Sequence, residues 1–157
     1  MKEVVILDNP NVAVDRIATG AIAFSREYDG DFVLLVTSLK SPYWVLPKGG
    51  LEEGITMQEN AAKELREEAG VVATIRPNPV FDGILDYPAF EGYRSKTQRE
   101  VYFLADYVDI SDEWDEAELR DVQWHSVNIE DLAKVMPPVQ LEILEIAYAA
   151  YCATQKQ

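Results

Sequence analysis

The sequence is poor in cysteine, histidine and positive charge. Among its 157 residues it has one cysteine, Cys152, and one histidine, His125. A lone cysteine cannot form a disulfide within the chain, which excludes a disulfide framework. We therefore expect a reducing, cytoplasmic setting.

Positive charge is scarce as well. The chain has 14 lysine and arginine residues against 28 aspartate and glutamate residues, a formal net charge of −14. Duplex DNA and anionic membranes need a basic protein face, so we expect no nucleic-acid partner and no membrane partner. No apolar run approaches the ~20 residues of a membrane helix, and the N-terminus lacks the pattern of a signal peptide. A small anion brought in with a metal ion remains compatible with this charge.

Length and composition favour one globular domain over residues 1–157, since 48% of the residues are hydrophobic. Apolar runs predict strands, and the polar breaks between them predict turns. The order of strands, one central helix and a pair of C-terminal helices predicts an α/β fold with a mixed sheet covered by helices. The expected strands cover residues 17–24, 32–36, 71–75, 81–87, 100–108 and 119–126.

The C-terminal helices are expected to begin after Asn128 and at Pro137-Pro138. The second has an apolar stripe that would pack equally well against a sheet or a partner subunit. Both a monomer and a homodimer therefore stay open. The stripe consists of Leu141, Leu144, Tyr148 and Tyr151.

A central helix is predicted over residues 57–69. Thr56 and Glu59 have the spacing of a capping box, and Gly70 supplies a C-terminal stop. Its apolar stripe is made of Met57, Ala61, Leu65 and Ala69.

Three glutamates lie on one side of this helix. Glu64, Glu67 and Glu68 stand at positions i, i+3 and i+4, so their side chains can converge. Glu68 lies at the border of the apolar stripe and should be partly buried. Clustered carboxylates repel one another, and a hard cation such as Mg²⁺ or Mn²⁺ would remove that cost. The alternative is an ordinary solvated acidic face.

Two further segments are candidates for contact with phosphate. Gly49 and Gly50 precede the helix in a predicted loop, where backbone amides could approach an anion beside Lys48. Taken alone, a Gly-Gly pair is more often an ordinary turn. A polar loop over residues 91–99 holds a local excess of positive charge that could contact the substrate. The alternative is that these basic residues are simply solvated. The cations of this loop are Arg94, Lys96 and Arg99.

An acidic segment follows over residues 110–118. We assign no chemistry to His125, because a packed or surface histidine explains its position beside Trp124.

The segment from Gly49 to Val71 resembles the Nudix box, a signature of Gly, five residues, Glu, seven residues, and Arg-Glu-aliphatic-x-Glu-Glu-x-Gly-aliphatic. The second half here is Lys63-Glu64-Leu65-Arg66-Glu67-Glu68-Ala69-Gly70-Val71. Two positions depart from the signature, because Ile55 replaces its first Glu and Lys63 replaces its Arg. In the family these two residues commonly pair to brace the loop, so their joint loss suggests a different brace. We expect Ile55 to make an apolar contact near the helix, and Lys63 to pair with Glu59 or Glu67.

The resemblance implies an α/β/α sandwich with a mixed sheet and a metal-dependent hydrolase of diphosphate linkages. It implies that Glu64, Glu67 and Glu68 hold Mg²⁺ or Mn²⁺. Either Glu67 or an acid of the 112–118 loop, for which we choose Glu116, would act on the attacking water. Two other classes stay open: a Nudix-like nucleotide-binding module without turnover, and a scaffolding protein that uses its acidic surface.

The residues before the helix, Trp44-x-x-Pro47-Lys48-Gly49, resemble members that act on dinucleoside polyphosphates or diphosphoinositol polyphosphates. A base needs a flat face on which to stack, whereas a phosphorylated inositol needs a dense basic pocket. Possible aromatic platforms outnumber nearby cations, so we favour a dinucleoside polyphosphate, with a diphosphoinositol polyphosphate as the alternative. The platforms are Tyr43, Trp44, Phe81, Tyr87 and Tyr93; the cations are Lys48, Arg94, Lys96 and Arg99, which Arg16, Arg26 or Arg76 could join.

Overall fold

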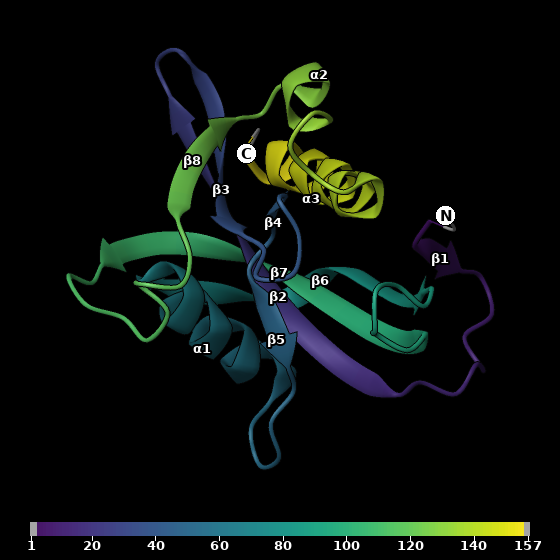
Figure 1. Ribbon diagram of the computed structural model, residues 1–157. Coiled ribbons are helices and arrows are strands. Elements are labelled where there is room, and N and C mark those ends of the chain that lie inside the picture. Colours follow the sequence, from purple (N-terminus) through teal and green to yellow (C-terminus); the bar gives the residue numbers. More distant parts are fainter. Residues whose placement is uncertain (1–2, 156–157) are drawn as a thin grey trace.

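The structure, a computed structural model, describes residues 3–155, except for the side chains of residues 107 and 108. These residues form eight strands and three helices (Figure 1). The strands are β1 (Val5–Leu7), β2 (Arg16–Glu27), β3 (Gly30–Thr37), β4 (Trp44–Val45), β5 (Lys48–Gly50), β6 (Val71–Tyr87), β7 (Lys96–Ile110) and β8 (Val122–Ser126). The helices are α1 (Met57–Ala69), α2 (Ile129–Leu132) and α3 (Pro138–Gln155).

The strands form one mixed sheet in the order β1-β6-β7-β2-β3-β4, with β5 also pairing with β2 and β8 with β3. The β2–β7 pair is parallel, and the other pairs are antiparallel. Strand β2 has two groups of partners: residues 16–23 pair with β7, and three of them lie beside β5 on the other edge, whereas residues 24–27 pair with β3. The β2–β3 hairpin and β8 therefore extend beyond the part of the sheet formed by β6 and β7, and they run beside α3 (Figure 1).

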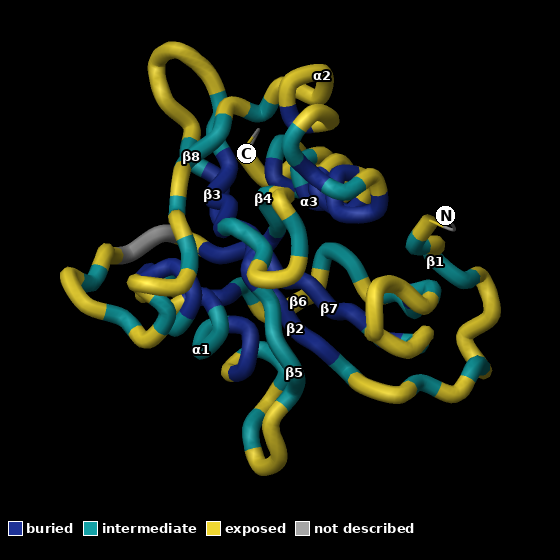
Figure 2. The backbone as a smooth tube through the Cα atoms, viewed as in Figure 1, coloured by how far each residue is buried: buried dark blue, intermediate teal, exposed yellow. Residues whose placement is uncertain are grey.

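Two hydrophobic clusters lie on opposite faces of this sheet. Figure 2 shows that buried residues run along the central strands and along α1 and α3. On one face α2 and α3 pack over residues such as Ile22 and Leu104. On the other face α1 packs over neighbours such as Ala21 and Phe103. Side chains alternate between faces along a strand, so β2 and β7 supply both clusters. The expected α/β/α arrangement with a mixed sheet is confirmed.

The stripe of α3 packs inside the molecule: Leu141, Leu144 and Tyr151 are buried and Tyr148 lies at the edge of the same cluster. This confirms the intramolecular role that was one of the two alternatives. Within the described residues no helix is both long and apolar enough to cross a membrane. A single domain over residues 1–157 stays a prediction.

Three expected boundaries were wrong. The loop expected over residues 91–99 ends before Lys96, because Lys96 already pairs with Tyr87 as the first residue of β7. Residues 71–87 form one strand rather than two, because the strand passes Pro77 and Pro79 through register shifts against β7 instead of ending there. A β-bulge leaves a residue unpaired, and a proline that cannot donate a hydrogen bond fits such a position. Strand β8 begins at Val122 rather than at Leu119, because the preceding residues form turns that dock on α1.

His125 is a packed residue, as the sequence suggested. Its ring meets Trp44 edge-on at 4.7 Å between centroids, and its Nε2 is buried without a hydrogen-bond partner among the described residues. Burial lowers the pKa of His125 below its ordinary value. A folded state that disfavours the imidazolium loses stability as pH falls through the ordinary histidine pKa of about 6.5.

We therefore expect His125→Phe to preserve the ring contact and to flatten the fall in stability between about pH 7 and pH 5. Removal of the unpartnered nitrogen should also raise the free energy of unfolding by about 1 kcal/mol at pH 7. Urea unfolding at several pH values measures both effects. Parallel pH profiles for the two proteins would contradict the assignment of this titration to His125.

Candidate active site

Helix α1 begins and ends at the predicted residues. The Thr56 hydroxyl accepts from the amide of Glu59 at 3.0 Å, and the Glu59 carboxylate accepts from the amide of Thr56 at 3.1 Å. Gly70 ends the helix with a left-handed φ of 69°. These caps satisfy backbone groups that a helix end otherwise leaves unpaired, so they fix which residues face the sheet.

The apolar face of α1 places Glu68 at the edge of the core. Ala61, Leu65 and Ala69 are fully buried under the sheet. Glu68 is only 3% exposed, so the expectation of partial burial is confirmed and exceeded. Glu64 and Glu67 are half-buried beside it.

The buried Glu68 carboxylate has two polar contacts. One oxygen accepts from the Lys48 amide at 3.1 Å, and the other lies 3.4 Å from the Arg120 guanidinium. Burial raises the pKa of Glu68 to about 8; repulsion from Glu64 and Glu116 adds to the rise, while Arg120 and Lys48 oppose it. A carboxylate in this environment favours a nearby cation.

Glu64 lies directly against the backbone of Gly49. A Cβ at residue 49 would lie 2.2 Å from the Glu64 carboxyl carbon, so only glycine permits this approach. The predicted Gly-Gly loop is in fact strand β5, with Gly49 opposite Thr19 of β2. Pairing with the central strand holds Gly49 against the helix. Burial raises the pKa of Glu64, and Glu67 and Glu116 raise it further.

Asn60 is a buried residue that the sequence reasoning missed. Its amide nitrogen donates to the Thr19 hydroxyl at 2.8 Å and to the Gly49 carbonyl at 3.3 Å, and its oxygen accepts from the Glu52 amide at 3.2 Å. The available signal was its position one helical turn before Glu64, on the same side of the helix. Asn60 thereby ties the helix to β2, β5 and the loop after β5.

Lys63 pairs with three carboxylates. Its ammonium lies 2.8 Å from Glu52, 2.9 Å from Glu67 and 3.6 Å from Glu64. The predicted pair with Glu67 is confirmed, and Glu52 rather than Glu59 is the additional partner. Ile55 is half-buried, but it is not among the described apolar residues that pack against either core cluster, so its apolar contact stays a prediction. The loop is thus tied to the helix through Glu52 and Lys63.

A double-mutant cycle tests this brace. A glutamate at residue 55 should compete with Glu52 for Lys63, so Ile55→Glu alone is expected to lower turnover several-fold. Lys63→Arg offers a forked group that can bind two carboxylates, so the double variant should recover most of the loss. The measurements are turnover and thermal unfolding for the four proteins of the cycle. Strictly additive effects would refute a shared ionic brace.

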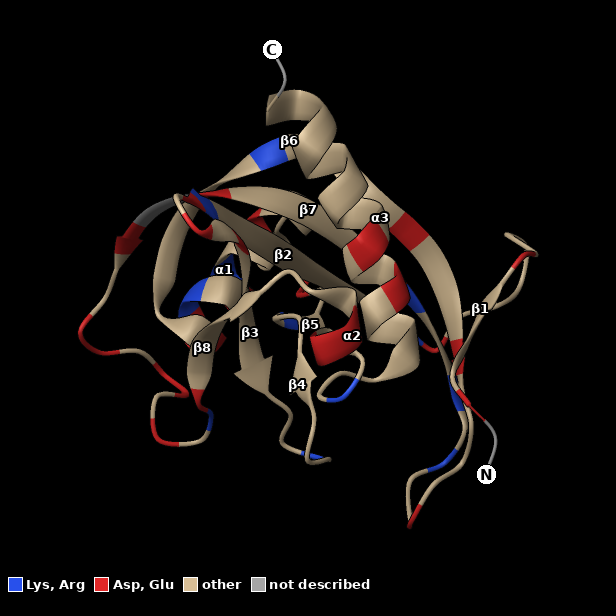
Figure 3. Ribbon diagram, turned by 90° about the horizontal axis from the view of Figure 1, so that it is seen from above, with Lys and Arg blue, Asp and Glu red and all other residues tan. Residues whose placement is uncertain are grey.

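The loop between β7 and β8 brings Glu116 next to Glu67 of α1. This loop is largely acidic (Figure 3). The Glu116 amide donates to the Glu67 carbonyl at 3.0 Å, and the Trp114 ring lies over Gly70, where a Cβ would come within 2.4 Å of it. The loop therefore docks on the last turn of α1.

Arg120 links this loop to the helix, and it is the second residue that the sequence reasoning missed. Its guanidinium contacts Glu116 at 2.7 Å and Glu68 at 3.4 Å and donates to the Thr37 carbonyl at 2.8 Å. The spacing of Glu116 and Arg120 at i and i+4 was a signal, but only the fold brings Arg120 to Glu68.

Four carboxylates therefore gather around the last two turns of α1: Glu64, Glu67, Glu68 and Glu116. Within the described part of the chain, no three acidic, histidine or cysteine side chains already stand as close as ligands around one ion. Their burial and mutual repulsion, and the purely oxygen donor set, nevertheless fit a hard divalent cation.

A cavity of about 410 Å³ lies beside these carboxylates, between the sheet, the start of α3 and the loops after β3 and β6. Its lining contains four cations, Lys40, Lys48, Arg94 and Lys96, and three rings, Tyr87, Phe90 and Tyr93. No carboxylate is part of this described lining. Burial lowers the pKa of Lys96, and repulsion from Lys40, Arg16 and Lys48 lowers it further. Lys48 belongs to both places, since it lines the cavity while its backbone amide donates to the Glu68 carboxylate.

Most of the residues predicted to bind the substrate lie in or next to the cavity, but Arg99 does not. Lys48, Arg94 and Lys96 line the cavity, with Gly49 and Gly50 following Lys48 on β5. Arg99 does not line it, because its guanidinium pairs with Asp82 at 2.7 Å. Among the further arginines, only Arg16 is near enough to affect Lys96, while Arg26 pairs with Asp31 and Arg76 with Asp106.

Only some of the predicted aromatic platforms line the cavity. Tyr87 and Tyr93 line the cavity, and Phe90 joins them without having been predicted. Trp44 packs on His125 and Phe81 on Tyr102, so neither lines it. Two of the cations lie over the ring faces, Lys40 over Tyr93 at 4.9 Å and Lys96 over Tyr87 at 5.1 Å. Cations therefore outnumber aromatic rings here, the reverse of the ratio expected from the sequence.

A buried polar network supports the floor of this cavity. Glu100 is fully buried and accepts hydrogen bonds from Tyr87, from Gln98 at 2.8 Å and from Tyr102 at 2.9 Å. Gln140 of α3 donates to the Tyr102 hydroxyl at 3.1 Å. Because buried polar groups are costly unless they are paired, this network fixes the orientation of Tyr87.

The structure thus combines a mixed sheet between helices with a glutamate-rich helix that is joined through Lys48 to a cationic cavity. The family model described as "NUDIX domain" matches residues 14–145, and the chain belongs to this family.

Named relatives agree with this family. The "Uncharacterized Nudix hydrolase YvcI" of Bacillus subtilis (strain 168) is 29% identical over 62% of this chain; the match spans 60% of that protein, less than two thirds of its length. The "Diphosphoinositol polyphosphate phosphohydrolase 3-alpha" of Mus musculus is 31% identical, over 73% of this chain and 68% of the relative. Among solved structures, the C. elegans Ap4A hydrolase is similar in fold, with a TM-score of 0.61 and 20% identity, over 87% of this chain and 98% of that one.

Proposed function

We propose that this protein is a metal-dependent hydrolase that cleaves a diphosphate linkage in a nucleoside diphosphate joined to another group. One observation is decisive for the proposal: Lys48 joins a buried carboxylate cluster to a cavity lined by four cations and no described carboxylate. Phosphates in this cavity would lie next to the carboxylates. Membership in the family, whose relatives are named as hydrolases, supports the same activity.

Each residue of the site has a separate task in this proposal. Glu64, Glu67 and Glu68 hold Mg²⁺ or Mn²⁺, a cation that neutralises phosphate charge and lowers the pKa of a bound water when present. Glu116 accepts the proton of the attacking water, with Glu67 as the alternative base. Arg120 holds Glu116 and Glu68 in position. Lys48, Arg94 and Lys96 bind the phosphates, and Gly49 leaves room for Glu64.

We favour a dinucleoside polyphosphate as substrate, because the exposed rings of Phe90 and Tyr93 offer faces on which a base can stack. The fold is shared with the C. elegans Ap4A hydrolase. A diphosphoinositol polyphosphate is the second candidate, and the four cations of the cavity favour it. The mouse relative is named as a diphosphoinositol polyphosphate phosphohydrolase. We place the reaction in a reducing, cytoplasmic setting, with the protein acting as a monomer or homodimer.

Side-by-side steady-state kinetics test this proposal. Diadenosine tetraphosphate and a diphosphoinositol polyphosphate should be assayed with Mg²⁺, with Mn²⁺ and with excess chelator. We expect turnover that needs the metal and a larger kcat/KM for the dinucleotide. A larger kcat/KM for the inositol compound would reverse the substrate choice. Binding of nucleotides without any turnover would show a non-catalytic module instead.

The cavity cations should act on substrate binding more than on turnover. Lys48→Gln and Arg94→Gln each remove one charge facing the phosphates and are expected to raise KM about tenfold, with a smaller change in kcat. Arg99→Gln is the matched control, because it removes the same charge from a residue that pairs with Asp82 outside the cavity. An equal rise in KM for all three variants would show a general charge effect and would remove the cavity from the proposal.

A further inference from the structure

Glu100 is a buried carboxylate that has no task in the reaction proposed above. It lies on β7 and is fully buried. Its carboxylate accepts hydrogen bonds from Tyr87, which lines the cationic cavity, and from Gln98 at 2.8 Å and Tyr102 at 2.9 Å. All three donors are neutral groups. Among the described residues, no lysine, arginine or histidine forms an ion pair with Glu100.

Strand register explains why this carboxylate lies next to the cavity. Every second residue of β7 points to the same face of the sheet, and here these residues form a polar row. The row consists of Lys96, Gln98, Glu100 and Tyr102. Lys96 lines the cavity, pairs with Tyr87 in the strand register and lies 5.1 Å from the centroid of the Tyr87 ring. The Tyr87 side chain therefore contacts Glu100 through its hydroxyl and Lys96 through its ring face.

The charge of Glu100 acts on the cavity across this ring. Burial lowers the pKa of Lys96, and repulsion from Lys40, Arg16 and Lys48 lowers it further, whereas attraction to Glu100 opposes the change. A carboxylate that attracts this ammonium also repels a phosphate bound beside it. Because Glu100 is fully buried, salt screens this repulsion less than it screens the effect of an exposed charge.

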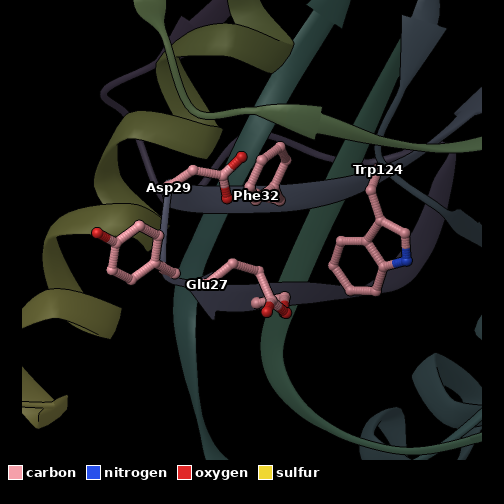
Figure 4. Close-up of a pocket in the computed structure, with 6 residues that line it drawn as sticks. Glu27, Asp29, Phe32 and Trp124 are labelled. Atoms are coloured by element: carbon pink, nitrogen blue, oxygen red, sulfur yellow. The ribbon is translucent and has the colours of Figure 1, made fainter.

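Other carboxylates of the chain lie in a different environment. Figure 4 shows Glu27 and Asp29 at a second cavity, on the hairpin of β2 and β3. Both residues are exposed, so solvent and salt screen their charges. They add to the net charge of the chain, but neither belongs to the described lining of the cationic cavity.

We propose that Glu100 determines the specificity of the cationic cavity, because its buried negative charge limits the preference for highly charged phosphate compounds. This inference rests on the proposed function, in which the cavity binds the phosphates. The four cations by themselves would favour the anion with the most charge. Each phosphate charge is attracted by the cations and repelled by Glu100, so Glu100 reduces the advantage of a densely phosphorylated ring the most. A short chain of phosphates, as in a dinucleoside polyphosphate, is affected less.

Glu100→Gln removes the charge with little change of shape. The new side-chain amide can donate to Gln98 Oε1, which is buried without a hydrogen-bond partner among the described residues. Its oxygen can still accept from a tyrosine hydroxyl, so we expect the variant to fold, as thermal unfolding would show. Isothermal titration of the full chain in excess chelator measures the affinity for inorganic pyrophosphate and for inorganic tripolyphosphate. The variant should bind pyrophosphate about threefold and tripolyphosphate about tenfold more tightly than the parent protein.

The possible results separate this inference from the proposed function. If the parent protein bound neither anion, the cavity would not be a phosphate site and both would fail. If the parent bound both anions and Glu100→Gln changed neither affinity, or changed both equally, only the role of Glu100 would be overturned. Weaker binding by the variant would show that Glu100 supports the structure of the cavity, which would also overturn its role in specificity.

Two control variants separate the buried charge from other effects. Glu27→Gln makes the same substitution on the exposed hairpin of Figure 4 and should change either affinity less than about twofold. A gain equal to that of Glu100→Gln would assign the effect to the net charge of the chain and overturn the proposal. Tyr102→Phe removes a hydrogen bond to Glu100 but keeps its charge, so the ratio of the two affinities should stay that of the parent. A tenfold gain for tripolyphosphate in this variant would also overturn the proposal.

Steady-state kinetics with Mg²⁺ extend the test to whole substrates. Glu100→Gln should raise kcat/KM for a diphosphoinositol polyphosphate about fivefold relative to kcat/KM for diadenosine tetraphosphate, because the inositol compound has more phosphate charges to gain from the lost repulsion. Glu27→Gln should leave this ratio unchanged. The same ratio in Glu100→Gln and in the parent protein would overturn the role of Glu100 in specificity.

Discussion

Glu68→Gln is expected to leave the fold intact and to remove most of the divalent-ion binding and activity. The glutamine has the same shape but lacks the charge that must hold the cation at the border of the core. Because Glu68 is 3% exposed and its pKa is raised by burial, removal of the charge should not lower the free energy of unfolding. Loss of a metal ligand should exceed the 10–100-fold loss typical of its supporting residues, so we expect turnover to fall by about a hundredfold or more.

Isothermal titration with Mn²⁺ and thermal unfolding distinguish lost metal binding from lost structure. Glu64→Gln should behave in the same way. Arg66→Ala is the control, because Arg66 lies on the exposed side of the same helix and should change neither quantity much. Turnover in Glu68→Gln comparable to that of the parent protein would rule out Glu68 as a ligand.

Gly49→Ala is expected to weaken metal binding and turnover because it displaces the Glu64 carboxylate. The added methyl group would lie 2.2 Å from the Glu64 carboxyl carbon, so the carboxylate must move away from the cluster. Overpacking of this kind costs about 1–3 kcal/mol, which a folded domain can tolerate. We expect Mn²⁺ affinity and kcat to fall about ten- to a hundredfold in a protein that still folds.

The neighbouring glycine gives a matched comparison. A Cβ at residue 50 would meet the end of the flexible Arg16 side chain at 2.9 Å, and that side chain can turn aside. Gly50→Ala should therefore cause a much smaller loss, of a few-fold. If both variants lost Mn²⁺ affinity equally, strain in β5 rather than displacement of Glu64 would be the cause.

The sequence by itself determined helix α1 and its acidic face. Thr56, Glu59 and Gly70 are local signals, because a cap depends on residues within one turn of the helix end. The spacing of Glu64, Glu67 and Glu68 fixes their common side in any helix of this period. The order of strands and helices was also enough to predict a mixed sheet covered by helices, although Pro77 and Pro79 hid the continuity of β6.

The tertiary structure alone decided which residues complete the site. Arg120 reaches Glu68 from 52 positions further along the chain, and Asn60 reaches Thr19 across 41 positions, as strand pairing and helix docking bring them together. The same holds for the cavity, where Arg99 turned out to face Asp82 and Lys40 to lie over Tyr93. The face to which a strand residue points depends on register, and register is fixed by pairing partners far away in the chain. For this reason the carboxylates of one helix could be found from local spacing, whereas the cations of the cavity required the assembled sheet.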